Sequence, residues 1–155
     1  MYQNILVAVD GSASSQRALN EAIRMAQLAH GKVTALYVLD QSTTFTYAGE
    51  YDPRAFVDAL REDARRVLDD AQKRFTELGV AGDVEMVETE SVGEDIATCL
   101  QRCAHRRRAD LFVMGTHGRR GMRRLVLGSV AERFLRFSTC PVLLVREEAP
   151  AIEPR

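Results

Sequence analysis

The stretch VMGTHGRRGMRRLVLGSVAERFL, residues 113–135, holds four of the chain's ten glycines within fourteen residues. Glycine loses more backbone freedom on folding than any other residue. This density therefore predicts a loop whose role requires backbone without side chains. An apolar run, residues 111–114, precedes the loop, and a helical pattern follows it from Ser129. The stretch therefore predicts a strand, a glycine-rich loop and a helix in succession.

The same alternation runs through the rest of the chain. Residues 4–10 (NILVAVD) and 33–39 (VTALYVL) are apolar and rich in β-branched residues, which is typical of strands covered on both faces. A pattern of apolar residues at helical spacing follows each of them and ends at a glycine. Residues 84–89 alternate with glutamate and predict an outer strand, and residues 142–145 (VLLV) predict the last strand.

This order of elements predicts an α/β fold. Strands that alternate with helices form a parallel sheet with right-handed crossovers and helices on both faces. A chain of 155 residues is long enough for one domain with a buried core. We expect this domain to span residues 1–146 and residues 147–155 to form a flexible C-terminal tail.

Composition excludes several classes of protein. With 46% apolar residues, 28% charged residues and a net charge of −1, the chain is neither disordered nor a general nucleic-acid-coating protein. We interpret the basic run HRRR, residues 105–108, as cations at a helix C-terminus, where they favour the helix dipole. The sequence shows no signal peptide and no apolar run of about 18 residues, so we expect a cytoplasmic protein without a membrane span.

The cysteines indicate a reduced protein. Their number is odd, and Cys99, Cys103 and Cys140 form no CxxC motif. Cys99 and Cys103 stand four residues apart on an expected helix, which is compatible with a metal pair, but no histidine or second cysteine pair lies at a suitable spacing. We therefore interpret these cysteines as packing residues.

A binding site is expected where two strands end. In open parallel sheets ligands bind outside the carboxyl ends of the strands, where neighbouring crossovers leave in opposite directions. The first strand ends at Asp10 and the fourth at Gly115. If these strands are neighbours, both loop tips face one crevice.

The glycine pattern indicates that the ligand carries phosphate groups. It reads G-x2-G-x9-G-S and consists of Gly115, Gly118, Gly128 and Ser129. Successive bare amides and a helix start provide partial positive charge for an anion. The chain has neither GxxxxGK[ST] nor a GxGxxG after its first strand. Spacing alone also allows tight turns, with Ser129 and Glu132 forming a capping box at the helix start.

Three further residues of the crevice allow more than one role. The Asp10 carboxylate either bonds a ribose hydroxyl or a metal ion, or caps the turn that follows it. His117 could shuttle protons, but we interpret it as a loop-supporting or solvent-facing side chain. Arg119, next to Gly118, is the arginine of the spacer best placed for a phosphate oxygen.

The chain closely resembles the universal stress protein family, nearly end to end. The resemblance rests on ILVAVDGSASS (5–15), VLD (38–40), ADLFVMGTHGRRG (109–121) and LVLGSVAERFLRFSTCPVLLV (125–145). The G-x2-G-x9-G-[ST] pattern marks the nucleotide-binding members of that family. The resemblance implies a Rossmann-like, adenine nucleotide alpha hydrolase-like domain with a five-stranded parallel sheet in the order 3-2-1-4-5 and four helices.

The resemblance also implies a bound ATP with Mg²⁺ and a homodimer paired through the last strand. Ala8, Val9 and Asp10 would border the adenosine, and Val38 would meet the adenine edge. The ribose and phosphates would be enclosed by Gly115, Gly118, Gly128, Ser129 and Val130. We also count Met114 and Arg119 among the expected cofactor-binding residues. One departure is Ala8, where many members of the family have proline.

The function expected on these grounds is that of a cytoplasmic ATP-binding stress-response regulator, which acts through dimerisation or through a protein partner. The alternative is a slow ATP hydrolase or another adenine-nucleotide enzyme that uses His117 or Asp10. A nucleotide-free dimeric scaffold is a third possibility, and the intact glycine pattern opposes it. Because the chain has neither a P-loop lysine nor a base at a fixed spacing, we assign no catalytic residue.

Overall fold

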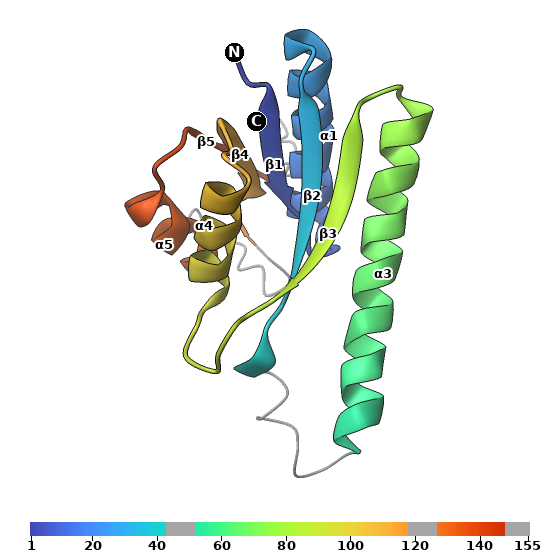
Figure 1. The fold of residues 1–155 in the computed structure, drawn as a ribbon, viewed down its shortest axis with the longest axis vertical. Helices are drawn as coiled ribbons and strands as arrows, with labels where there is room; N and C mark the ends of the chain where they lie inside the picture. Colours follow the sequence, from blue (N-terminus) through green and yellow to red (C-terminus); the bar gives the residue numbers. More distant parts are fainter. Residues whose placement is uncertain (43–51, 118–126, 148–155) are drawn as a thin grey trace, which may run out of the picture.

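The computed structural model of the chain describes residues 1–42, 52–117 and 127–147. Within these residues strands and helices alternate (Figure 1). Their order is β1 (Asn4–Ala8), α1 (Ala13–Ala29), β2 (Lys32–Leu39), α3 (Pro53–Glu77), β3 (Gly82–Glu88), α4 (Ile96–Arg106), β4 (Leu111–Gly115), α5 (Ser129–Phe137) and β5 (Val142–Val145).

The five strands form one parallel sheet in the order β3-β2-β1-β4-β5. This confirms the expected topology, including the outer position of the third strand. From β1 the chain builds the sheet outward through β2 and β3, and then crosses to the other side of β1 for β4 and β5 (Figure 1). The switch in direction therefore lies between β1 and β4.

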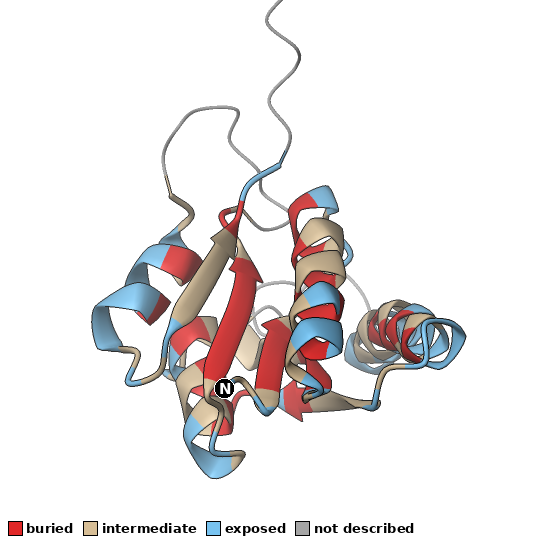
Figure 2. Ribbon diagram, turned by 90° about the horizontal axis from the view of Figure 1, so that it is seen from above, coloured by how far each residue is buried: buried red, intermediate tan, exposed pale blue. Residues whose placement is uncertain are grey.

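Helices cover both faces of the sheet, and the alternation along β1 shows which helices cover which face. Ile5 packs in a core cluster with Leu19 of α1 and Phe75 of α3. The next residue, Leu6, packs in a second cluster with Leu100 of α4 and Phe134 of α5. Viewed from above, the buried residues lie along the central strands and on the inner sides of the helices (Figure 2). The sheet is thus buried on both sides, as its continuous apolar runs predict.

Polar side chains fix the helix starts. The expected serine cap of α1 is confirmed: the hydroxyl of Ser12 accepts a hydrogen bond from the Ser15 amide at 3.2 Å. At the start of α4, Asp95 accepts from the Thr98 amide at 2.8 Å and forms an ion pair with Arg133 of α5 at 2.7 Å. The hydrogen bonds from the Thr98 hydroxyl and amide lower the pKa of the Asp95 carboxyl. Asp95 therefore caps one helix and links it to the next.

The basic run at the end of α4 has acidic partners on β3. Arg107 forms ion pairs with Glu85 at 2.7 Å and with Asp83 at 3.4 Å, and it donates to the Thr34 hydroxyl at 3.2 Å. Arg106 also pairs with Glu85. Burial raises the pKa of Asp83, but the Thr34 hydrogen bond and the charge of Arg107 outweigh it and leave that pKa below its usual value. Two arginines of the run, Arg106 and Arg107, thus belong to an ion-pair network with β3 as well as lying at the end of α4.

The structure bears in part on two further expectations, which concern a membrane span and the C-terminal tail. Among the described residues, no helix is both long and apolar enough to cross a bilayer. The expected tail begins at residue 147, and residues 148–155 lie outside the described part of the chain.

Candidate functional site

The loops after β1 and β4 meet at the switch point of the sheet. The two strands are direct neighbours, with Leu6 in register with Phe112 and Val7 with Val113. β1 ends at Ala8, two residues earlier than the sequence predicts, although the Val9 amide still donates to the Leu36 carbonyl at 2.9 Å. The chain then turns at Gly11, which has a φ of 83°. Both loop tips therefore open on the same edge of the sheet.

Asp10 organises the first loop tip. Its Oδ1 accepts a hydrogen bond from the Ser12 amide at 2.9 Å, and its own amide lies 3.3 Å from the Ser15 hydroxyl. The structure thus shows the turn-capping role that the sequence left open for Asp10. This bond holds the Asp10 carboxylate at the loop tip, three residues before the first residue of α1.

Gly115 lets α1 approach the end of β4. A Cβ atom added at Gly115 would lie 2.0 Å from the Ser14 Oγ and 2.9 Å from the Ser14 Cβ. Ser14 is buried, and its hydroxyl donates to the Val145 carbonyl at 3.4 Å. The same carbonyl accepts the Thr116 amide at 3.0 Å. The first turn of α1, the tip of β4 and the end of β5 are therefore packed together around a bare glycine.

Gly128 closes the glycine-rich loop at its base. Its amide donates to the Thr116 carbonyl at 2.7 Å. A Cβ atom at this position would lie 2.8 Å from that carbonyl oxygen and 3.5 Å from the His117 Cα. The residue after β4 and the residue before α5 are therefore in direct contact. Gly118 and Arg119, two of the expected site residues, lie outside the described residues.

The start of α5 differs from the sequence-based expectation. Gly128 is the N-cap, with φ −60° and ψ 153°, and Ser129 is the first helical residue. The expected capping box of Ser129 and Glu132 is therefore wrong, since the extended N-cap conformation falls one residue earlier. No side chain caps this helix start. Its first-turn amides add partial positive charge where the loop closes.

Four of the expected site residues share one face of the sheet. Ala8, Val38, Met114 and Val130 all belong to or pack against the core cluster on the α4 and α5 side. Val38 lies two residues beyond Leu36, the last β2 residue in register with β1. Val9 lies in the other cluster, on the α1 and α3 side, and is 4% exposed. The structure therefore separates Val9 from the other apolar residues of the expected site.

His117 makes a local contact. Its Nδ1 lies 3.1 Å from the hydroxyl of Thr116, and its side chain is half-buried. This contact supports the loop at the point where Gly128 approaches it, which agrees with the loop-supporting interpretation.

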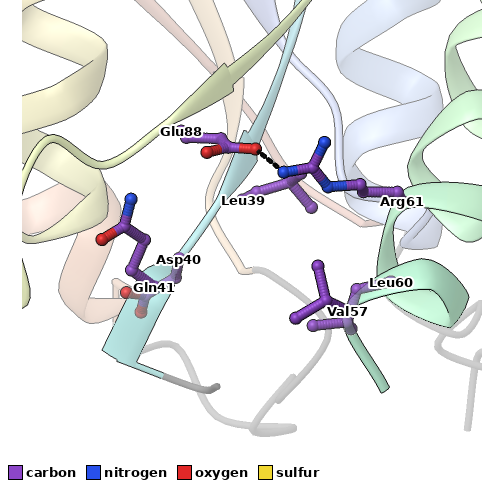
Figure 3. Close-up of a pocket in the computed structure, with 7 residues that line it drawn as sticks. All are labelled: Leu39, Asp40, Gln41, Val57, Leu60, Arg61 and Glu88. Atoms are coloured by element: carbon purple, nitrogen blue, oxygen red, sulfur yellow. Dashed lines mark hydrogen bonds and ion pairs between the residues drawn. The ribbon is translucent and has the colours of Figure 1, made fainter. Parts of the chain in front are cut away.

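A small cavity lies between the carboxyl ends of β2 and β3 and the first turns of α3 (Figure 3). Its volume is about 200 Å³, and the Arg61–Glu88 ion pair forms one of its walls. Sites for drug-sized ligands are typically about 300–1,000 Å³. The cavity is lined by Leu39, Asp40, Gln41, Val57, Leu60, Arg61 and Glu88. None of these is an expected nucleotide-site residue.

The architecture and the site define a class of protein: a Rossmann-like α/β domain whose glycine-lined loops meet at the switch point of the sheet. The sequence pattern of the universal stress protein family matches residues 1–146, and the chain belongs to this family.

Individual relatives agree with this assignment. A universal stress protein of Methanocaldococcus jannaschii is 35% identical over 147 residues, which cover 95% of this chain and 84% of the relative. The crystal structure of a family member from Burkholderia pseudomallei is 45% identical, with a TM-score of 0.74 over 93% of this chain and 96% of that one. A universal stress protein solved in complex with cAMP is 27% identical, with a TM-score of 0.63 over 94% and 97% of the two chains.

Proposed function

We propose that this universal stress protein binds an adenine nucleotide, ATP with Mg²⁺, at the tips of β1 and β4, and that nucleotide occupancy regulates its pairing with a second copy or with a protein partner. The observation that carries the proposal is the contact between Gly128 and Thr116. It closes a glycine-rich loop directly in front of a helix start that no side chain caps. Backbone amides in this arrangement suit phosphate oxygens.

The apolar residues supply a place for the base. Ala8, Val38 and Met114 lie on one face of the sheet, at the ends of three adjacent strands. In the proposed complex the adenine contacts Val38, and the Asp10 carboxylate at the rim bonds a ribose hydroxyl. The relative solved with cAMP supports an adenine nucleotide as the ligand class.

The proposed Mg²⁺ depends on the nucleotide. The described part of the chain contains no group of three or more His, Cys, Asp or Glu side chains that could hold a metal ion. Mg²⁺ commonly keeps several waters and binds through substrate phosphates and one or two carboxylates. Here Asp10 is the carboxylate at the rim of the site, and the ion would neutralise phosphate charge.

The proposed pairing uses the edge strand β5, which ends the sheet beside β4. An edge strand presents unpaired backbone groups that a second copy can satisfy across a two-fold axis. The end of β5 is also tied to the site, because the Val145 carbonyl accepts from both Ser14 and Thr116. This link gives the nucleotide site a physical connection to the pairing edge.

In a cell the protein would act in the cytoplasm.

The test is a thermal melt of the full chain with Mg-ATP, AMP or cAMP. At a ligand concentration about 100-fold above Kd, linkage stabilises the fold by about 2.7 kcal/mol. For a domain of this size, that corresponds to a rise in Tm of about 5–10 °C. Sedimentation with and without the nucleotide measures the proposed effect on pairing.

Two glycine variants provide the comparison. Gly128→Val places a side chain against the Thr116 carbonyl and should abolish the nucleotide-induced shift. Gly93→Val is the matched control, because a Cβ atom there would meet only the Ser91 Oγ, at 4.0 Å. A parent protein whose Tm moves by less than about one degree with all three nucleotides would remove the proposal. Release of phosphate or AMP, erased by His117→Ala, would instead favour the hydrolase alternative.

A further inference from the structure

Helix α4 carries two cysteines and two arginines on one stripe. Cys99, Arg102, Cys103 and Arg106 stand at positions i, i+3, i+4 and i+7, which lie on one side of a helix. Both cysteines are fully buried in the core cluster, as the packing interpretation predicts. Besides their ion pairs with glutamates, the guanidinium groups of Arg102 and Arg106 also lie against the sulfur atoms.

The sulfur atoms have polar surroundings. The guanidinium of Arg102 donates to the Cys99 Sγ at 3.4 Å, and that of Arg106 donates to the Cys103 Sγ at 4.0 Å. The two cysteines stand one helical turn apart and belong to the same buried cluster. The Cys99 thiol lies 3.9 Å from the Glu88 carbonyl of β3, at the seam between α4 and the sheet. Two adjacent sulfur atoms therefore lie beneath a pair of cations at one place in the fold.

The arginine heads are held by acidic groups. Arg102 pairs with Glu94 at 3.0 Å and with Glu90 at 3.3 Å, and Arg106 pairs with Glu85. Their side chains are 29% and 50% exposed, so they form the boundary between the buried sulfur atoms and solvent.

We propose that Cys99 and Cys103 form a two-sulfur site for a soft monovalent metal ion, with copper(I) as the representative ion. Soft thiolate ligands select copper(I), whereas structural zinc sites need four protein ligands. The described residues offer no group of three or more His, Cys, Asp or Glu ligands, which excludes a complete zinc site within them but leaves a two-coordinate ion possible.

The chemistry of binding is balanced and involves no redox step. The two S–H bonds lose their protons to solvent, and two copper–sulfur bonds form. The product, a copper(I) ion with two thiolates, has a net charge of −1. The guanidinium groups of Arg102 and Arg106 donate to the sulfur atoms and would stabilise the thiolates, while they keep their glutamate partners.

The test is an anaerobic titration of the reduced full chain with copper(I), in competition with the chromophoric chelator bathocuproine disulfonate. We expect one tightly bound ion per chain. Cys99→Ala and Cys103→Ala should each weaken binding by more than about 100-fold, since removal of an outer partner of a metal ligand already costs about 10–100-fold. Cys140→Ala is the matched control and should bind like the parent, because Cys140 lies outside the stripe.

X-ray absorption of the copper-loaded parent identifies the atoms that bind copper. This measurement does not depend on whether the variants fold. Two sulfur neighbours, with no nitrogen or oxygen neighbour, would support the site. A copper ion with nitrogen or oxygen ligands would overturn it, and so would binding that survives Cys99→Ala or is lost in Cys140→Ala. These outcomes are independent of the nucleotide proposal, because the titration contains no nucleotide.

Discussion

Gly115→Ala tests the close contact between α1 and β4. The backbone of Gly115 is outside the left-handed region, so alanine meets no conformational strain there and any penalty is steric. The new Cβ would lie 2.0 Å from the Ser14 Oγ, 2.9 Å from its Cβ and 3.0 Å from its carbonyl carbon. Unstrained carbon contacts are about 3.5–4.0 Å. The Ser14 hydroxyl must therefore rotate, and the first turn of α1 must also move.

The expected penalty follows from these two changes. Overpacking in a well-packed core costs about 1–3 kcal/mol, and losing the hydrogen bond from Ser14 to the Val145 carbonyl adds about 0.5–1.5 kcal/mol. The restricted unfolded chain of the alanine variant returns about 0.4–1 kcal/mol. We expect a net loss of about 2–3 kcal/mol in the free energy of unfolding, or a Tm lower by about 4–12 °C.

The assay is urea unfolding followed by far-UV circular dichroism, which suits a chain without tryptophan. The control is a double-mutant cycle with Ser14→Gly, which removes the two side-chain contacts and leaves only the backbone contact at 3.0 Å. The double variant should be more stable than the sum of the single losses predicts, by about 1 kcal/mol or more. Additive losses, or a loss below about 0.5 kcal/mol for Gly115→Ala, would refute the steric explanation.

Three other results are expected. Asp95→Ala should lower the free energy of unfolding by about 1–2 kcal/mol. Asp95→Asn should lower it by less, because asparagine also caps helices. Equal losses for the two variants in urea unfolding would contradict this explanation. The pKa values of Asp83 and Asp95 lie below their ordinary value of 3.8, so their charged forms stabilise the fold above that pH. Their contribution should disappear as the pH falls through the folded-state pKa values, and a double Asn variant should show a weaker acid dependence in urea unfolding from pH 6 to 3. Removal of residues 147–155 should leave the Tm unchanged in calorimetry, and a marked drop would place the tail in the fold.

The order of the sheet could be predicted because each element has a strong local pattern. Buried parallel strands are continuous apolar runs, so residues 142–145 were predicted with the bounds that β5 has in the structure. The placement of the two loop tips followed from the topology. Both features depend on patterns among residues that are close in the sequence. They can therefore be predicted without knowledge of tertiary contacts.

Other features depend on contacts between distant residues. The capping box at Ser129 was wrong because the N-cap position depends on the backbone angles of Gly128, which its contact with Thr116 constrains. The basic run at the end of α4 gave no sign of its pairing with Glu85, which lies on another strand. Val9 was grouped with Ala8 because they are neighbours, although successive strand residues point to opposite faces.

The hydrogen bond between Gly128 and Thr116 also makes the segment between them a natural place for insertion. Since the two anchoring residues already touch, extra residues need not stretch β4 away from α5. Chain-closure entropy rises slowly, by about 0.6 kcal/mol for each doubling of a flexible loop. A reporter peptide grafted between these anchors would therefore leave the scaffold intact while it altered whatever the loop recognises, which makes the junction a practical handle for engineering.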